Sequence, residues 1–267
     1  MRAHRTRSRF IVFVTAFSID TVLAVIAQPP GFLWNKPAWA PTPIVPADNP
    51  MTDAKVQLGR RLFYDVRLSS DETMSCASCH RQASAFTDGQ QLHLGVTGEL
   101  GIRNAMTLTN VAYLPSYTWA NPTITSLEKQ MLIPLFTEHP VEMGMVGQED
   151  HLVAKLNADE RYPPMFRASF PEDGGKVSLS TITKAIAAFE RTLLSFNSPY
   201  DHYKHGEPNA ISPSAKRGEA LFFGERLECY HCHGGVNFTD NHQQQGQAFP
   251  ETGFHNTGLY NEDGLGT

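Results

Sequence analysis

Two five-residue motifs, each Cys-x-x-Cys-His, contain every cysteine of the chain. They are Cys76-Ala77-Ser78-Cys79-His80 and Cys229-Tyr230-His231-Cys232-His233. The two-residue gap lets both sulfurs reach one edge of a porphyrin as thioethers, and the adjacent histidine then ligates the iron beneath the ring. The motifs therefore predict two covalently bound c-type haems, each attached through its two cysteines and ligated by its histidine.

Zinc and a disulfide or redox dithiol are the alternatives to weigh against haem. The motifs begin at residues 76 and 229, whereas a zinc ribbon needs Cys pairs that lie close in sequence or are brought together by a hairpin. A thioredoxin-like dithiol is expected in a βαβ context, which neither flank supplies. The net charge is −5 and basic residues cluster only at the extreme N-terminus, so we expect no nucleic-acid partner.

The N-terminal residues 1–27 have the pattern of an export signal. Four arginines precede an apolar run from Phe10 to Ala27, and small-residue cleavage options follow at Ala27 and as late as Ala40. The run is barely long enough to span a bilayer and contains Asp20, so membrane association is expected only if it stays uncleaved. Export agrees with covalent haem attachment and predicts a periplasmic protein.

Residues 28–50 are rich in proline and are expected to form a leader without helix or central strand. Regular structure is then predicted to begin at Thr52, as the N-cap of a helix that runs through Phe63. A second helix is predicted to start at Pro213. We assign residues 51–205 to an N-terminal cytochrome c domain and residues 206–267 to a C-terminal one.

The two predicted domains share a further pattern. Gly59–Phe63 and Gly218–Phe222 both read Gly-x-x-Leu-Phe, shortly before a Cys-x-x-Cys-His motif. We interpret this as an internal duplication in which the glycine admits a close helix crossing; coincidence between two short apolar helices is the alternative. The fold class predicted is mainly α, with two cytochrome c-like haem domains.

A cytochrome c domain also needs a closing helix that crosses its first helix. Ser180 is expected to cap such a helix in the first domain, with Ile182, Ile186, Phe189 and Leu193 at helical spacing and a stop at Asn197-Ser198-Pro199. Residues 234–267 are polar and Gly-rich and offer no such helix. The second domain is therefore expected to be incomplete, and the chain truncated.

Several stretches of the chain together resemble the bacterial di-haem cytochrome c peroxidase family, including its methylamine-utilisation and methanobactin-associated branch. They are Leu58–Ser69, Ser75–His80, Arg103-Asn104, Thr109–Ala112, Pro140–Gly144 and Ala188–Leu193. The run Glu138–Gly144 is most similar to that branch, whose members oxidise residues on a partner protein.

For the first motif, the resemblance implies a peroxide-reacting haem with His80 as its proximal ligand. Glu142 is implied as the distal acid/base group, with Gln130 near it. Cleavage of an O–O bond needs a group that takes a proton from one oxygen and returns it to the other, and a carboxyl group can do both. Without the resemblance, Glu142 would be interpreted as a surface carboxylate or as a charge at a helix N-terminus.

For the second motif, the resemblance implies an electron-transfer haem with His233 as its proximal ligand. Trp119 is implied as an electron relay between the haems and Asn104 as a ligand of a calcium ion between them. Their default explanations are aromatic core packing and a turn or cap. Ala120 follows Trp119 where the family continues with Asp-Gly-Arg, so the relay loop departs from the family pattern.

The sixth ligands also depart from the family pattern. Many members carry a distal histidine where this chain has Val96, with His93 three positions earlier; if His93 does not ligate, the first haem has an open sixth site. For the second haem, the family's sixth ligand and the other calcium ligands are expected beyond residue 267. Within the chain His242, His255 and Tyr260 are the substitutes, and His255 is the best of them.

These implications lead to one leading function and two alternatives. The leading one is a peroxidase that reduces hydrogen peroxide with electrons from a small periplasmic cytochrome c or cupredoxin. The first alternative uses peroxide to oxidise Trp or Tyr residues of a partner protein. The second is a di-haem electron carrier without enzymatic activity.

Overall fold

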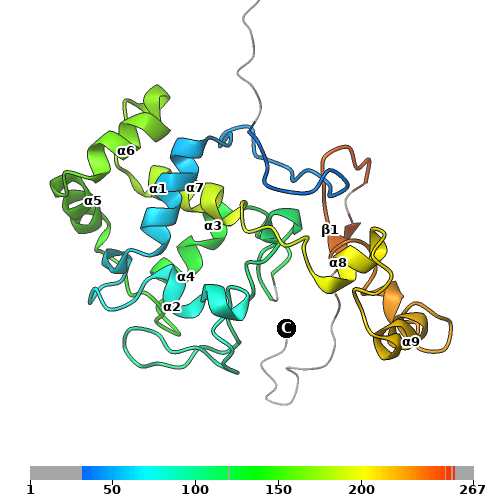
Figure 1. Ribbon diagram of the computed structural model, residues 1–267. Coiled ribbons are helices and arrows are strands. Elements are labelled where there is room, and N and C mark those ends of the chain that lie inside the picture. The colour runs from blue at the N-terminus through cyan, green and yellow to red at the C-terminus, as the bar shows by residue number, and fades with distance from the viewer. Residues whose placement is uncertain (1–31, 120, 250, 254, 256–267) are drawn as a thin grey trace, which may run out of the picture. The chain divides into compact units, whose positions relative to one another are not determined.

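The computed structural model describes residues 32–119, 121–249, 251–253 and 255. The expected signal peptide and Tyr260 lie outside them. The helices are α1 (Asp53–Phe63), α2 (Cys76–Cys79), α3 (Leu127–Gln130), α4 (Leu132–Phe136), α5 (Glu149–Ala158), α6 (Tyr162–Ser169), α7 (Leu179–Glu190), α8 (Pro199–Lys204) and α9 (Pro213–Phe222), and the strands are β1 (Asn241–His242) and β2 (Glu251–Thr252). This part of the chain is mainly helical, as predicted (Figure 1). None of its helices has the length and apolar character needed to cross a membrane.

Helices α1 and α7 cross in direct contact and form the centre of the core (Figure 1). Thr52 is the N-cap of α1, as predicted, and its side chain accepts a hydrogen bond from the Lys55 amide. Gly59 lies at the crossing, where an added Cβ would stand 1.8 Å from the carbonyl oxygen of Ala185. The glycine of the first Gly-x-x-Leu-Phe pattern therefore serves the close approach that the sequence predicted.

The predicted bounds of the closing helix α7 were wrong at both ends. Its N-cap is Ser178, whose hydroxyl accepts from the Thr181 amide while the Thr181 hydroxyl accepts from the Ser178 amide. Ser180 lies inside the first turn because this reciprocal capping box satisfies the helix end two residues earlier. The helix ends at Glu190, and Ser198 and Pro199 begin α8 rather than end α7.

Regular secondary structure begins at Thr52, the N-cap of α1, as predicted. Residues 32–50 contain no helix or strand, as their prolines predicted, but they are packed into the fold. The Asn49 side chain is buried and donates to Glu128 Oε1 at 2.7 Å and to the Lys184 carbonyl at 2.9 Å. The Tyr113 hydroxyl donates to the Pro41 carbonyl at 2.7 Å. Side-chain hydrogen bonds thus order a segment whose own backbone cannot form a helix.

The described residues after 205, which include α9, pack against one another and against α8. Tyr200 of α8 contacts Phe238 with ring centroids 5.2 Å apart, and Lys204 pairs with Glu219 of α9 at 3.0 Å. Helix α8 lies before the predicted domain boundary at residue 205, but its side chains contact residues that follow that boundary. The backbone after the second motif returns to the first domain, where the Gln243 amide donates to the Tyr113 carbonyl at 2.7 Å.

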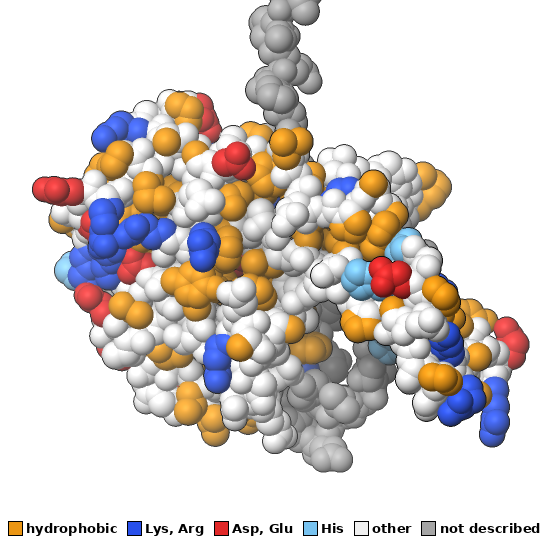
Figure 2. All heavy atoms as spheres, in the orientation of Figure 1, with side chains coloured by type: hydrophobic (Ala, Val, Ile, Leu, Met, Phe, Trp, Pro, Cys, Tyr) orange, Lys and Arg blue, Asp and Glu red, His pale blue; other side chains and the backbone are white. Residues whose placement is uncertain are grey.

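Helix α9 repeats the sequence pattern of α1 but not its packing. Its start after the N-cap Ser212 is as predicted. A Cβ added to Gly218 would meet no atom within 4 Å, so no described element crosses α9 there as α7 crosses α1. Leu221 is 40% exposed, and apolar side chains lie at the surface among Lys and Arg over this helix (Figure 2).

The two glycines give a matched test of the duplication. We expect Gly59→Ala to lower the free energy of unfolding by about 1–3 kcal/mol or more, because the new methyl group overlaps backbone atoms of α7. Gly218→Ala is expected to raise it by up to about 0.5–1 kcal/mol, since alanine is the better helix former and the space is open. Thermal unfolding of both variants would measure this; equal effects would contradict the packing difference.

Candidate functional site

The first motif lies on α2, a single turn that presents its cysteines and histidine together. The Ser75 amide donates to the Ser78 hydroxyl at 3.0 Å and fixes the start of the turn, and the His80 amide donates to the Cys76 carbonyl at 2.9 Å. His80 Nδ1 lies 2.9 Å from the Phe86 carbonyl oxygen. A carbonyl can only accept, so Nδ1 carries the proton and Nε2 is the nitrogen with a free lone pair.

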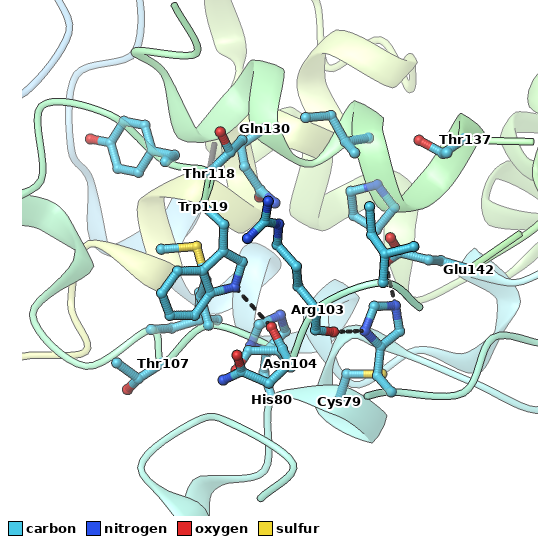
Figure 3. A pocket seen from close by; sticks show the side chains of 18 of the residues that line it. Cys79, His80, Arg103, Asn104, Thr107, Thr118, Trp119, Gln130, Thr137 and Glu142 are labelled. Atoms are coloured by element: carbon cyan, nitrogen blue, oxygen red, sulfur yellow. Dashed lines mark hydrogen bonds and ion pairs between the residues drawn. The ribbon is translucent and has the colours of Figure 1, made fainter. Parts of the chain in front are cut away.

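A cavity of about 380 Å³ opens beside His80, and a smaller one adjoins it. We call the two together the chamber. The residues that line both cavities are Cys79, His80, His93, Leu108, Gln130, Pro134 and Glu142. Figure 3 shows Gln130 and Glu142 reaching into the chamber from above His80 and Cys79. Proximal and distal residues predicted from separate parts of the sequence therefore share one space.

The residues of the chamber fit a c-type haem. Its wall includes Val111, Leu114 and Ile133, which suit an apolar porphyrin. Burial raises the pKa of the Cys76 thiol to about 12 and that of Cys79 to about 11, an environment that suits the neutral sulfur of a thioether better than a zinc-bound thiolate. Burial also lowers the pKa of His80, which keeps its imidazole neutral and able to bind iron.

Trp119 and Asn104 meet at the rim of the chamber. Trp119 is 44% exposed, and its Nε1 donates to the Asn104 carbonyl oxygen at 2.9 Å (Figure 3). Trp119 is therefore not the core aromatic residue that its default explanation required. The relay role of Trp119 and the calcium role of Asn104 stay predictions.

His93 faces Glu142 within the chamber. Its Nδ1 lies 3.1 Å from the Arg103 carbonyl oxygen, and its Nε2 lies 3.5 Å from Glu142 Oε2. The interaction with Glu142 raises the pKa of His93. Val96 lines neither cavity and donates its backbone amide to the Glu142 carbonyl at 2.8 Å. Sequence reasoning considered His93 only as an iron ligand or a loop residue and missed this pairing.

The second motif repeats a backbone arrangement of the first. His233 Nδ1 lies 3.0 Å from the Phe238 carbonyl oxygen, as His80 Nδ1 lies beside that of Phe86. Phe86 and Phe238 have positive φ angles of 59° and 54°, which are uncommon for a bulky residue. This shared geometry supports the duplication, and a phenylalanine a few residues after each Cys-His pair was the sequence signal for it.

The second motif is more open than the first, with Cys232 and His233 both exposed. The predicted sixth ligand His255 lies beside it: its Nε2 contacts Asp240, and ligand atoms of Cys232, Asp240 and His255 lie within 4.8 Å of one another. His242 instead stacks on Tyr113 with ring centroids 5.4 Å apart. The role of His255 stays a prediction.

Glu190 and Glu128 are two acids near the chamber with opposite pKa shifts. Glu190 is 4% exposed beside Cys76, its Oε2 has no hydrogen-bond partner, and burial raises its pKa to about 8. Burial also raises the pKa of Glu128, but its hydrogen bonds with Arg191 at 2.8 and 3.0 Å outweigh burial and hold the pKa at about 2.

Known proteins resemble this chain in sequence. Residues 53–209 match the family described as di-haem cytochrome c peroxidase. The methylamine utilization protein MauG of Methylophilus methylotrophus is 35% identical over 236 residues, which cover 88% of this chain and 64% of that protein. The cytochrome c peroxidase Ccp of Escherichia coli strain K12 is 35% identical over 196 residues, which cover 73% of this chain and 40% of that protein. The chain thus spans less than two thirds of the length of these curated relatives.

Solved structures resemble it in fold. A MauG-like protein associated with microbial copper homeostasis is 47% identical with a TM-score of 0.82, over 88% of this chain and 67% of that one. The di-haem peroxidase BthA from Burkholderia thailandensis is 26% identical with a TM-score of 0.54, over 73% of this chain and 54% of that one.

The two acids predict opposite effects of pH on stability. Folding raises the pKa of Glu190 from 4.5 to about 8. Between these two pH values the folded protein therefore binds more protons than the unfolded chain does. The contribution of Glu190 to the free energy of unfolding is fully present below pH 4.5 and is lost as the pH rises to about 8. We expect Glu190→Gln, a mimic of the neutral acid, to flatten this loss in denaturant titrations at several pH values.

Glu128→Gln is the matched control. It leaves the Arg191 guanidinium, which is 2% exposed, without its carboxylate, and is expected to lower the free energy of unfolding at pH 7 by about 3–5 kcal/mol. The stabilisation by Glu128 itself is lost only as the pH falls from 4.5 towards 2. If Glu190→Gln instead destabilised the protein most near pH 8, the conclusion that folding keeps Glu190 protonated and neutral would be wrong.

Proposed function

Because this chain belongs to the di-haem cytochrome c peroxidase family, we propose that it reduces hydrogen peroxide to water in the chamber beside His80. The observation that carries the proposal is that Glu142 and Gln130 line the same cavity as Cys79 and His80. A proton-transferring carboxyl group thus faces the space above the proximal histidine, where peroxide would bind.

Three side chains of the chamber have roles in this proposal, those of His80, Glu142 and Gln130. When bound, the haem supplies a coordination position for peroxide and one-electron redox chemistry. His80 would ligate the iron through Nε2, and the Phe86 carbonyl fixes the orientation of its ring. Glu142 takes a proton from the near peroxide oxygen and returns it to the departing one, and Gln130 hydrogen-bonds the peroxide from the same side.

Reduction of one peroxide to two waters needs two electrons and two protons. We propose that the electrons would come one at a time from a small periplasmic cytochrome c or cupredoxin, and that Cys229, Cys232 and His233 would hold the haem that supplies this electron transfer. Trp119, at the rim of the chamber, is the proposed relay between the two haems. The residues after the second motif touch the chamber wall, since Gln243 Nε2 donates to the Leu114 carbonyl at 2.9 Å.

The remaining assignments belong to the same proposal. Residues 1–27 would direct export to the periplasm. Residues 51–205 would hold the peroxidatic haem and residues 206–267 the electron-transfer haem. Asn104, at the rim beside Trp119, would contribute a ligand to a calcium ion between the haems.

A second candidate function keeps the chamber and changes the source of electrons. Peroxide would drive the oxidation of Trp or Tyr residues on a docked partner protein. One observation favours it: apolar side chains lie exposed at the chamber, with Leu94 at 55% and Ile102 at 65%. The expectation that Val96 replaces the family's distal histidine agrees with it. A neighbouring gene for a small secreted protein that contains Trp or binds copper would distinguish it from the first.

Replacement of Glu142 tests the acid/base role. We expect Glu142→Gln to lower steady-state peroxide turnover with a reduced donor by about 10²–10⁴-fold, since an amide cannot carry the proton. Glu138→Gln is the matched control, because Glu138 belongs to the same run, is exposed and does not line the chamber. Activity that survives in Glu142→Gln, or that falls equally in both variants, would refute the assignment.

A further inference from the structure

A glycine-rich hairpin, residues 93–101, packs against the segment that carries Glu142. The Gly101 amide donates to the His93 carbonyl at 2.8 Å and the Gly95 amide to the Glu99 carbonyl at 2.9 Å, which closes the hairpin. A Cβ on Gly95 would lie 1.7 Å from the Val141 carbonyl oxygen. The hairpin backbone therefore lies directly on the backbone next to Glu142, at a distance that only glycine permits.

Two hydrogen bonds fix the register between the hairpin and this segment. The Val96 amide donates to the Glu142 carbonyl at 2.8 Å, and the Val141 amide donates to Glu99 Oε2 at 2.9 Å. On the opposite side, the Met143 amide donates to the Pro134 carbonyl and the Ser70 amide to the Met143 carbonyl, both at 2.9 Å. The backbone on both sides of Glu142 is thus held in place.

His93 stands at the foot of this hairpin and faces the Glu142 side chain. Its ring packs on Gly101, where a Cβ would lie 2.2 Å from Cε1. The Arg103 carbonyl holds Nδ1–H, so the ring is fixed on one face and at one nitrogen. The other nitrogen, Nε2, is buried and has no hydrogen-bond partner among the described residues, and Glu142 Oε2 lies 3.5 Å from it. The negative charge of Asp88 also acts on this ring.

We propose that His93 is a positioning residue for Glu142: through Nε2 it holds the carboxyl group in the orientation that serves proton transfer in the chamber. His93 acts through Glu142 and not as an iron ligand. This inference rests on the proposed function of the chamber and adds to it the hairpin as the element that orients the acid/base group. Its ring is already held at Nδ1 by the Arg103 carbonyl and on one face by Gly101, so it offers Glu142 a fixed support.

Cyanide capture by the oxidised di-haem protein tests the proposal without peroxide turnover. Hydrogen cyanide must give up its proton as the anion binds iron, so its association rate reports on a well-placed distal base. We expect His93→Leu to slow association by about tenfold or more, a part of what a general base contributes. Gly101→Ala should slow it similarly, because the added methyl group displaces a chemically intact His93 ring.

Two further variants separate positioning from general damage. Because Nδ1–H is held by Arg103, only the protonated His93 ring donates an Nε2–H toward Glu142. His93→Gln offers an amide N–H in its place and should keep association within about threefold of the wild type. Leu100→Ala alters an exposed side chain of the same hairpin that does not line the chamber and should leave the rate unchanged. Wild-type rates in both His93→Leu and Gly101→Ala, or equal slowing in Leu100→Ala, would overturn the proposal.

The wild-type protein distinguishes this inference from the proposed function. If it captures cyanide and the variants behave as above, both stand. If it captures cyanide and the His93 variants are unchanged, only the positioning role fails. If the wild type captures no cyanide, the first haem has no accessible distal site, and the proposed peroxidase function fails together with the inference.

Discussion

The contact between Gly59 and the Ala185 carbonyl determines how the rest of the first domain is arranged. Because α1 and α7 meet at backbone distance, Phe63 at the end of α1 packs on Phe189 of α7, with ring centroids 5.2 Å apart, and on Phe86, 6.3 Å away. The Phe86 carbonyl in turn orients the His80 ring. A helix crossing in the core is thereby connected, through one aromatic cluster, to the proximal side of the haem site.

The distal side of the chamber has a different origin. It is built from loops and short helices rather than from the helix pair, and hydrogen bonds between backbone groups hold it. Gly95 and Gly101 allow the hairpin 93–101 to lie on the segment that carries Glu142. His80, the predicted proximal ligand, is thus supported by apolar packing, whereas Glu142, the proposed acid/base group, is supported by polar contacts.

The sequence predicted what depends on local patterns. The Cys-x-x-Cys-His motifs, the N-cap Thr52, the helix start at Pro213 and the Gly-x-x-Leu-Phe patterns are readable within a few residues, and the helices α1 and α9 begin as expected. The N-cap of α7 was misplaced because Ser178 and Ser180 are both suitable caps, and only the partner Thr181 decides between them. Order in residues 32–50 was missed because it depends on distant partners such as Glu128 and Tyr113.

The candidate site was predictable only in part for the same reason. Glu142 and Gln130 were reached through resemblance to a family, and the structure brings both to the chamber with His80. The pairing of His93 with Glu142 depends on the register of a hairpin, which no local pattern of the sequence expresses.

The spin state of the first haem tests the central claim most directly, that the chamber leaves the distal side of the iron open to peroxide. Electron paramagnetic resonance of the matured ferric protein is the measurement. The account predicts a high-spin signal from the haem proposed at Cys76 and Cys79, because it assigns that iron no ligand from Val96 or His93. Low-spin signals alone, from two six-coordinate irons, would contradict the account and favour an electron carrier.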